Sequence, residues 1–240
     1  MAAPVNEGNI IVGSGKLYKL FFTKIIETDA TANTIQLATT PTPPTFENND
    51  VIRVWGIHED DDGELTVTGW DAGTRKITVA AIATDTTNQG YLVSYARGES
   101  ELGGTEDGAE IVGAKEYHDV EGAEAPVTLR KELTSFKPTL NTNLLESTLD
   151  NLLLNWPGAT SGGTLTIGTD GETTQMGLKL VGKAPQGDTR TYMFWRTVSI
   201  GDGGHRYTKG ANTIISTEFE MLPIWDYTND KWIFGTIVDA

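Results

Sequence analysis

The sequence predicts a mainly β protein, an antiparallel β-sandwich or barrel with one flanking α-helix. Two observations carry this prediction. Short segments rich in β-branched and aromatic residues recur along most of the chain, and each is bounded by Gly, Asn, Asp or Pro. Only residues 144–156 place apolar side chains at helical spacing. The 240 residues suffice for one large domain or two small ones.

The first hundred residues predict a series of short strands separated by turns. A hairpin is expected over residues 65–79, with its loop near residues 70–74. The expected strands are 10–13, 16–26, 33–38, 51–57, 64–70, 75–82 and 90–96.

The second part of the chain mixes a loop, a long extended segment, a helix and further strands. Residues 99–110 are acidic and rich in Gly, which predicts a loop followed by a short strand, and residues 125–144 predict a long extended segment. The helix ends at Pro157, and its expected apolar face consists of Leu145, Leu149, Leu152, Leu153 and Trp156. Further strands are expected at 163–168, 175–184, 189–200, 211–222 and 232–240.

The net charge of −15 is concentrated in one part of the chain. Residues 1–25 hold one acid and three bases, and residues 126–240 hold twelve acids and ten bases. Residues 26–125 hold twenty acids and five bases, so this segment accounts for the whole excess of acids over bases in the chain. This balance argues against a protein that grips nucleic acid, because phosphates are neutralised by basic patches.

The chain contains no cysteine, so it has neither a disulfide framework nor a thiolate metal site. It has no run of 18 apolar residues, and its start lacks the pattern of a signal peptide. We therefore expect a protein without a membrane anchor, made in a cytoplasm.

Two short motifs resemble ligand-binding loops without completing them. A phosphate-binding loop needs a Gly, then four residues, then Gly-Lys-Ser/Thr, but Ile10 stands at the first Gly and Leu17 follows Lys16. We interpret Gly13–Gly15 as a turn between two strands. In "HEDDDGE" (58–64), His58 takes the place of the first calcium ligand and Gly69 that of the bidentate Glu, so an acidic hairpin tip is the favoured interpretation over a looser calcium site.

No catalytic constellation is present in the sequence. His58, His118 and His205 have no second His at ligand spacing, which argues against zinc. Residues 192–200 gather aromatic residues around Arg196, which fits either a stacking platform for sugars or bases or, preferably, a buried strand. The sequence thus predicts a protein that is not an enzyme, with no catalytic residues, no metal ligands and no cofactor.

Several stretches taken in order resemble the major tail tube proteins of long-tailed bacteriophages. They are an early "GSGKLY" (Gly13–Tyr18), "TEDG" (Thr105–Gly108), a helix opening in "LLESTLDNL" (Leu144–Leu152), "ISTEFEMLP" (Ile215–Pro223), and a closing "GTIVD" (Gly235–Asp239). The resemblance covers residues 1–26 and 98–240 as a discontinuous core domain. Residues 27–97 do not fit it, and we expect them to form an inserted small β-barrel or sandwich on the outer surface.

The resemblance implies a structural virion protein of the phage tail. Six such subunits form a ring, and the rings stack into a tube that delivers double-stranded DNA without binding it specifically. The implied partners are further copies of the chain, a tape-measure protein, a tail terminator and baseplate or initiator proteins. The implied location is the virion tail, assembled in the cytoplasm of the bacterial host. The acidic segment 99–124 would either line the bore or, as we prefer, form a solvated loop that orders on ring stacking.

Three other classes stay open at this point. The chain could be another virion component, such as a head-decoration or tail-terminator protein. It could be a subunit of a contractile secretion or bacteriocin tube. It could also be a carbohydrate-binding or hydrolytic β-sandwich.

Overall fold

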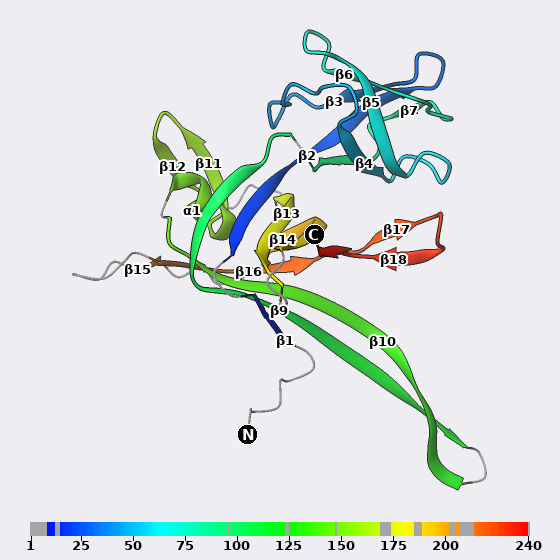
Figure 1. Ribbon diagram of the computed structural model, residues 1–240, viewed down its shortest axis with the longest axis vertical. Helices are drawn as coiled ribbons and strands as arrows, with labels where there is room; N and C mark the ends of the chain where they lie inside the picture. The colour runs from blue at the N-terminus through cyan, green and yellow to red at the C-terminus, as the bar shows by residue number, and fades with distance from the viewer. Residues whose placement is uncertain are drawn as a thin grey trace. The chain divides into compact units, whose positions relative to one another are not determined.

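The computed structural model confirms the mainly β class with one helix. It describes residues 9–12, 15–95, 97–122, 125–146, 148–168, 174–184, 189–201, 205–206 and 214–239. Strands make up 64% of the chain (Figure 1). The chain divides into two compact units. The first unit consists of Met1–Gly15, Gly104–Thr174 and Val198–Met221. The second unit consists of Lys16–Gly103, Gln175–Thr197 and Leu222–Ala240.

The second unit contains a closed antiparallel barrel of six strands. Their order is β2-β3-β6-β5-β4-β8, and β8 pairs back onto β2, so the barrel has no open edge. All five strands expected between residues 33 and 96 are present, and the sixth is β2, which begins well before them. The strands are β2 (Lys16–Asp29), β3 (Thr34–Leu37), β4 (Val51–Trp55), β5 (Gly63–Asp71), β6 (Lys76–Val79) and β8 (Tyr91–Ser94); the short β7 (Thr86–Thr87) also pairs with β2.

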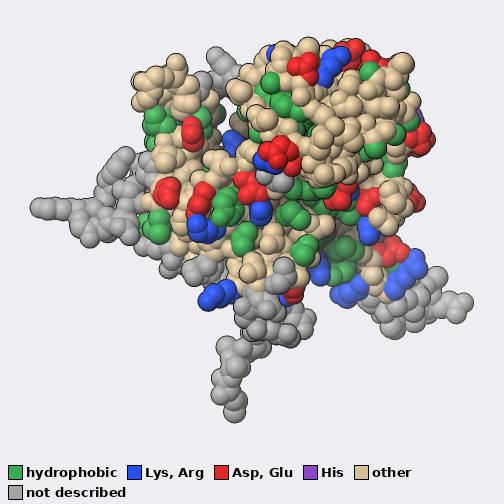
Figure 2. All heavy atoms as spheres, turned by 45° about the horizontal axis from the view of Figure 1, so that its top comes forward, with side chains coloured by type: hydrophobic (Ala, Val, Ile, Leu, Met, Phe, Trp, Pro, Cys, Tyr) green, Lys and Arg blue, Asp and Glu red, His purple; other side chains and the backbone are tan. Residues whose placement is uncertain are grey.

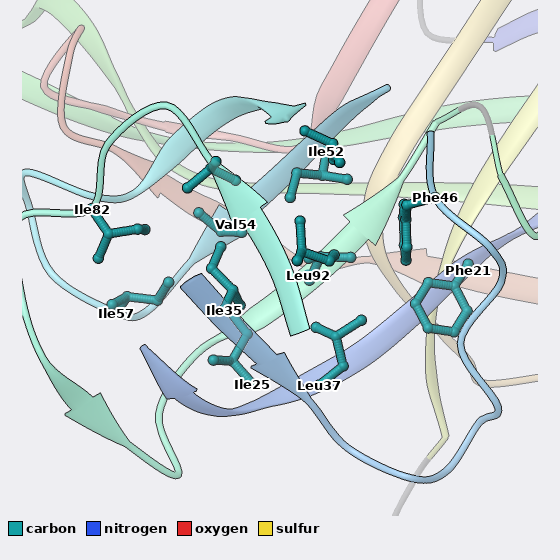
Figure 3. Packing of buried hydrophobic residues seen from close by; sticks show 13 residues of the cluster. Phe21, Ile25, Ile35, Leu37, Phe46, Ile52, Val54, Ile57, Ile82 and Leu92 are labelled. Atoms are coloured by element: carbon teal, nitrogen blue, oxygen red, sulfur yellow. The ribbon is translucent and has the colours of Figure 1, made fainter. Parts of the chain in front are cut away.

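The barrel is filled by aliphatic and aromatic side chains. Strands β3 and β6 alternate buried and partly buried positions, as period-2 patterning requires. Figure 3 shows the buried cluster, to which Phe21 and Ile25 of β2 contribute together with residues of the five other strands. Phe46 lies edge-on to Phe21, with ring centroids 6.1 Å apart, and to Trp70 at 5.2 Å. Each fully buried side chain of this size contributes about 1.5–3 kcal/mol.

Strand β2 links the barrel to a second set of strands. Its residues Lys16–Leu20 pair with β13 (Gln175–Lys183), whereas Phe21–Lys24 pair with β8 and Ile25–Asp29 with β3. Strand β13 pairs with β14 (Thr189–Ser199). Strand β14 also pairs with the C-terminal strand β19 (Gly235–Asp239). A hairpin of β17 (Ile224–Asp226) and β18 (Lys231–Ile233) completes the unit.

A second hydrophobic cluster packs outside the barrel. It joins Leu20, Trp55 and Val93 to Trp195 of β14 and Ile224 of β17. The barrel strands thus bury side chains on both faces, because every second residue of β2, β4 and β8 points away from the barrel interior.

The first unit is built on a long two-stranded ribbon of β9 (Ser100–Gly122) and β10 (Ala125–Leu144). Strand β1 (Asn9–Val12) pairs with β9, and β16 (Ile214–Met221) pairs with β10 and with the short β15 (His205–Arg206). The helix α1 (Leu149–Asn155) is followed by a hairpin of β11 (Gly158–Ser161) and β12 (Thr164–Ile167).

The expectation that residues 99–110 form a loop, and the preferred loop interpretation of the acidic segment 99–124, are wrong. Residues 100–122 form one strand, paired along its length with β10. The Gly residues that suggested a loop are accommodated as local irregularities, with positive φ at Gly103 and Gly108. The acidic residues fit because much of the ribbon is exposed on both faces, so its charges stay in water.

The helix is shorter than predicted and buries other residues. It begins at Leu149 and not at residue 144, because Leu144 still pairs with Ile215 of β16. Thr148 caps it by accepting the Asn151 N–H at 3.1 Å. Asn151 and Leu154 are its buried side chains, whereas the expected leucine face is only half-buried.

Candidate functional site: an exposed ribbon and an aromatic hairpin

Among the described residues, the distal half of the ribbon is two strands wide. Strands β1 and β16 join it only at residues 109–112 and 139–144. Beyond them, Gly113 faces Pro138 and the pairing continues to Gly122 and Ala125. Figure 1 shows β9 and β10 running on together past β1 and β16. Ten paired residues of β9 extend about 30 Å, at roughly 3.3 Å per residue.

One face of this distal ribbon carries an exposed apolar pair. Tyr117 and Leu133 lie directly opposite each other and are 52% and 54% exposed. Because side chains alternate along a strand, Lys115 and Lys131 share that face. The Lys131 ammonium lies 3.3 Å from the Asp119 carboxylate. We call the face formed by Lys115, Tyr117, Asp119, Lys131 and Leu133 the ribbon face.

The opposite side of the distal ribbon carries charged side chains, with Val120 opposite Arg130. Arg130 and Glu132 form an ion pair there at 2.5 Å, with both side chains largely exposed. His118 lies opposite Glu132 and is exposed as well. The apolar pair therefore distinguishes the ribbon face from its reverse.

The β17–β18 hairpin also has two different faces. Ile224 and Ile233 lie opposite each other and belong to the second hydrophobic cluster. Trp225 and Trp232 form the next opposed pair, with ring centroids 4.9 Å apart in an edge-to-face arrangement. Tyr227 lies edge-on to Trp225 at 6.3 Å.

The three aromatic residues of the hairpin form a surface that we call the aromatic face. Trp232 is 62% exposed, although Trp side chains are usually more than half covered, and Tyr227 is 44% exposed. The connecting turn is held by Asp226, which accepts the Asn229 side-chain amide at 2.9 Å. The buried isoleucines thus anchor a hairpin that presents aromatic rings to solvent.

The glycine-rich start does not form a phosphate site in the described residues. Residues 13 and 14 of the expected turn lie outside the described part of the chain. Lys16 begins strand β2, and no helix follows it. Its ammonium lies 3.1 Å from the Glu101 carboxylate. The side chain that would reach a phosphate is engaged in an exposed ion pair.

The acidic stretch 58–64 uses two of its carboxylates to hold the backbone. Asp62 accepts the N–H groups of Gly56 and Ile57 at 2.7 and 2.9 Å, and Asp61 accepts those of Ala83 and Thr84 at 2.6 and 2.9 Å. Burial raises the pKa of Asp62, and the hydrogen bonds only partly offset that effect. These carboxylates organise loops of the barrel, and no group of three ligand-type side chains gathers within the described residues.

The remaining sequence candidates do not come together. Tyr192, Phe194 and Trp195 are buried in β14, so the buried-strand interpretation of residues 192–200 is correct and the stacking platform is not. Arg196 donates to the Gln175 side chain at 3.0 Å. The three histidines lie in separate elements, in the loop after β4, in β9 and in β15.

Sequence reasoning missed the residues that form both exposed faces. Tyr117 lies in the segment expected to be a loop, so its partner Leu133 could not be inferred. The alternation Trp225-x-Tyr227, followed by Trp232, was the available signal for the hairpin.

The chain matches no known protein-family model and no curated protein. Within the described residues, no helix has the length and apolar character needed to cross a bilayer.

Proposed function

We propose that this chain is a structural subunit that assembles with copies of itself into a tube, in the manner of a phage tail tube. Six subunits form a ring, and stacked rings enclose a bore for double-stranded DNA. The proposal builds on the sequence resemblance to major tail tube proteins and on the mainly β fold.

The distal ribbon is the observation that carries this proposal. A two-stranded hairpin gains little stability by itself in water. This one extends for about 30 Å beyond its neighbouring strands, at roughly 3.3 Å per residue, and exposes Tyr117 opposite Leu133. A neighbouring subunit that covered the exposed pair would bury its apolar surface and stabilise the ribbon. In a tube it would reach between rings and lock them.

The surface charge supports a role in passing DNA without holding it. On the face seen in Figure 2, acidic and basic side chains of the described residues are interspersed rather than gathered by sign. The net charge of −15 repels phosphates at long range. DNA would then move through the bore without specific binding.

The proposed partners follow from that role. A tape-measure protein would occupy the bore before DNA, and a tail terminator and baseplate or initiator proteins would cap the two ends. The proposed location is the virion tail, after assembly in the host cytoplasm. The division into a core (1–26 and 98–240) and an outer insert (27–97) stays a prediction.

Negative-stain electron microscopy of the purified protein over a range of concentrations tests the proposal. We expect hollow filaments or six-fold rings. Single particles without rings at every concentration, confirmed as monomers by light scattering, would contradict it.

A further inference from the structure

We propose that Thr134 fixes the pairing register of the distal ribbon. Two registers, one residue apart, are open to β9 and β10 beyond the Glu116–Ser135 pair, and the Thr134 hydroxyl favours the one that places Leu133 beside Tyr117. The register is a property of the single chain, so it does not depend on the proposed assembly.

Thr134 is an extra residue in β10. Ser135 lies opposite Glu116 and Leu133 lies opposite Tyr117, so two steps along β10 match one step along β9. Such a bulge leaves the extra residue unpaired in the ladder. The side chain of Thr134 supplies a contact instead, because its hydroxyl donates a hydrogen bond to the Glu116 carbonyl oxygen at 3.1 Å.

The bulge decides which face of the ribbon Leu133 occupies. Leu133 and Phe136 are three residues apart, and in a regular strand this odd spacing would put them on opposite faces. Across the bulge they lie opposite Tyr117 and Lys115, which share a face because β9 alternates regularly there. Phe136 lies on the same face as Gly113, since a Cβ added at Gly113 would be 3.0 Å from its ring. The bulge therefore gathers these apolar side chains on the ribbon face.

The alternative register would remove the bulge at this point. Thr134 would then lie opposite Tyr117 and Leu133 opposite His118, so Leu133 would turn to the reverse of the ribbon face. The extra residue would move toward the tip, where the pairing is already irregular between residues 125 and 130.

The contributions that separate the two registers are small and opposed. The alternative register would place Glu132 opposite Asp119, so that two carboxylates face each other, and it would break the Lys131–Asp119 ion pair of 3.3 Å. In its favour, it would restore regular pairing at the bulge. An exposed ion pair contributes little, and among the described residues no third strand pairs with this part of the ribbon. One hydrogen bond from Thr134 is then enough to decide the register.

NMR spectroscopy of two substitutions tests the role of the hydroxyl, at concentrations where light scattering detects no assembly. Thr134→Val removes the donor and keeps the branched shape, whereas Thr134→Ser keeps the donor. A nuclear Overhauser effect from the Leu133 methyl groups to the Tyr117 ring reports the bulged register, and one to the His118 ring reports the alternative. Thr134→Val should raise the ratio of the second signal to the first at least about threefold over wild type, and Thr134→Ser should leave it unchanged.

Deletion of Thr134 gives a second test with a different expectation. Without the extra residue, β10 can pair regularly and still bring Leu133 opposite Tyr117. The deletion variant should therefore keep the signal to the Tyr117 ring and gain none to the His118 ring. All three variants should keep the wild-type circular dichroism spectrum, because Thr134 is exposed.

Three outcomes would overturn the proposal. An unchanged ratio in Thr134→Val would mean that the hydroxyl does not choose the register. A shift in Thr134→Ser equal to that in Thr134→Val would mean that the hydrogen bond is not the cause. Loss of the Tyr117 signal on deletion would mean that β10 has no residue to spare there. If Thr134→Val shifts the ratio as expected but the wild-type protein forms no tubes, the proposed function fails and the role of Thr134 stands.

Discussion

At the scale of single residues, buried polar side chains fix the loops of the barrel. Asp61 is 5% exposed and accepts two backbone N–H groups, from Ala83 and Thr84. Arg53 places its guanidinium 4.1 Å from the centroid of the Trp195 ring and 3.5 Å from the Glu64 carboxylate. Both residues connect segments that are distant in the sequence.

Asp61→Ala should lower the free energy of unfolding by about 2–4 kcal/mol, because it leaves two buried N–H groups without their charged acceptor. Asp60→Ala is the matched control, since the Asp60 side chain is 68% exposed, and it should change stability by less than about 0.5 kcal/mol. Urea unfolding followed by tryptophan fluorescence measures both. Equal effects would mean that Asp61 does not hold the loop.

Arg53→Lys should destabilise the protein by about 1–2 kcal/mol, although it keeps the charge, because an ammonium cannot stack as a planar guanidinium does. Arg130→Lys, on the exposed ribbon, provides the control and should be neutral within about 0.5 kcal/mol. Thermal unfolding compares the two variants. A neutral Arg53→Lys would show that charge alone is required at this position.

At the scale of elements, an ion pair fastens the C-terminal strand. Arg190 and Asp239 are register partners of β14 and β19 and form two hydrogen bonds, at 2.5 and 2.7 Å. Ile237 and Val238 of the same strand are largely exposed, so apolar burial holds it only weakly. The ion pair therefore adds to the backbone pairing of five register partners that joins β19 to β14.

The hydrogen bonds from Arg190 lower the pKa of Asp239 below its ordinary value of 3.8. A lowered carboxyl pKa stabilises the folded state above pH 3.8, and that contribution is lost as the pH falls through the lowered value. Acid should therefore loosen β19 only below pH 3.8, with no effect between about pH 5 and 7. An NMR titration of the Asp239 carboxyl carbon tests this. In Arg190→Gln the midpoint should return to the ordinary value; an unchanged midpoint would exclude Arg190 as its cause.

The ribbon should be removable without unfolding the rest of the chain. Glu116 and Ser135 are register partners, so replacing residues 117–134 by Asn-Gly closes a shorter hairpin. We expect the same thermal unfolding midpoint within a few degrees, because the described side chains at 117–119 and 130–134 are exposed. We also expect no tubes by electron microscopy. Normal tubes from this variant would show that the distal ribbon is not an assembly element.

At the scale of the whole molecule, net charge would oppose the proposed assembly. A subunit with a net charge of −15 repels its copies, and added salt screens that repulsion. Raising NaCl from about 10 to 150 mM shortens the screening length from about 30 to 8 Å. The concentration at which light scattering detects assembly should therefore fall. A rise would mean that ion pairs between subunits outweigh the net repulsion.

Local patterning was sufficient to predict most strands. The short apolar segments between residues 33 and 96 alternate clearly and are bounded by turn residues, so each was found close to its true limits. The same rules failed where pairing over long distances decided the conformation. Residues 100–122 carry loop-like Gly and acidic residues, yet their backbone groups find partners in β10. The leucines near 145 have helical spacing, yet β16 keeps Leu144 in a strand.

By itself the sequence determined the mainly β class, the single helix and the acidic balance, because composition and short-range periodicity are local properties. Only the tertiary structure decided that β2 closes the barrel, since that depends on its pairing with both β3 and β8. It also decided which apolar residues stay exposed. Tyr117, Leu133 and Trp232 are of residue types that are common in strands and cores. They are exposed because no other described element of the chain covers them.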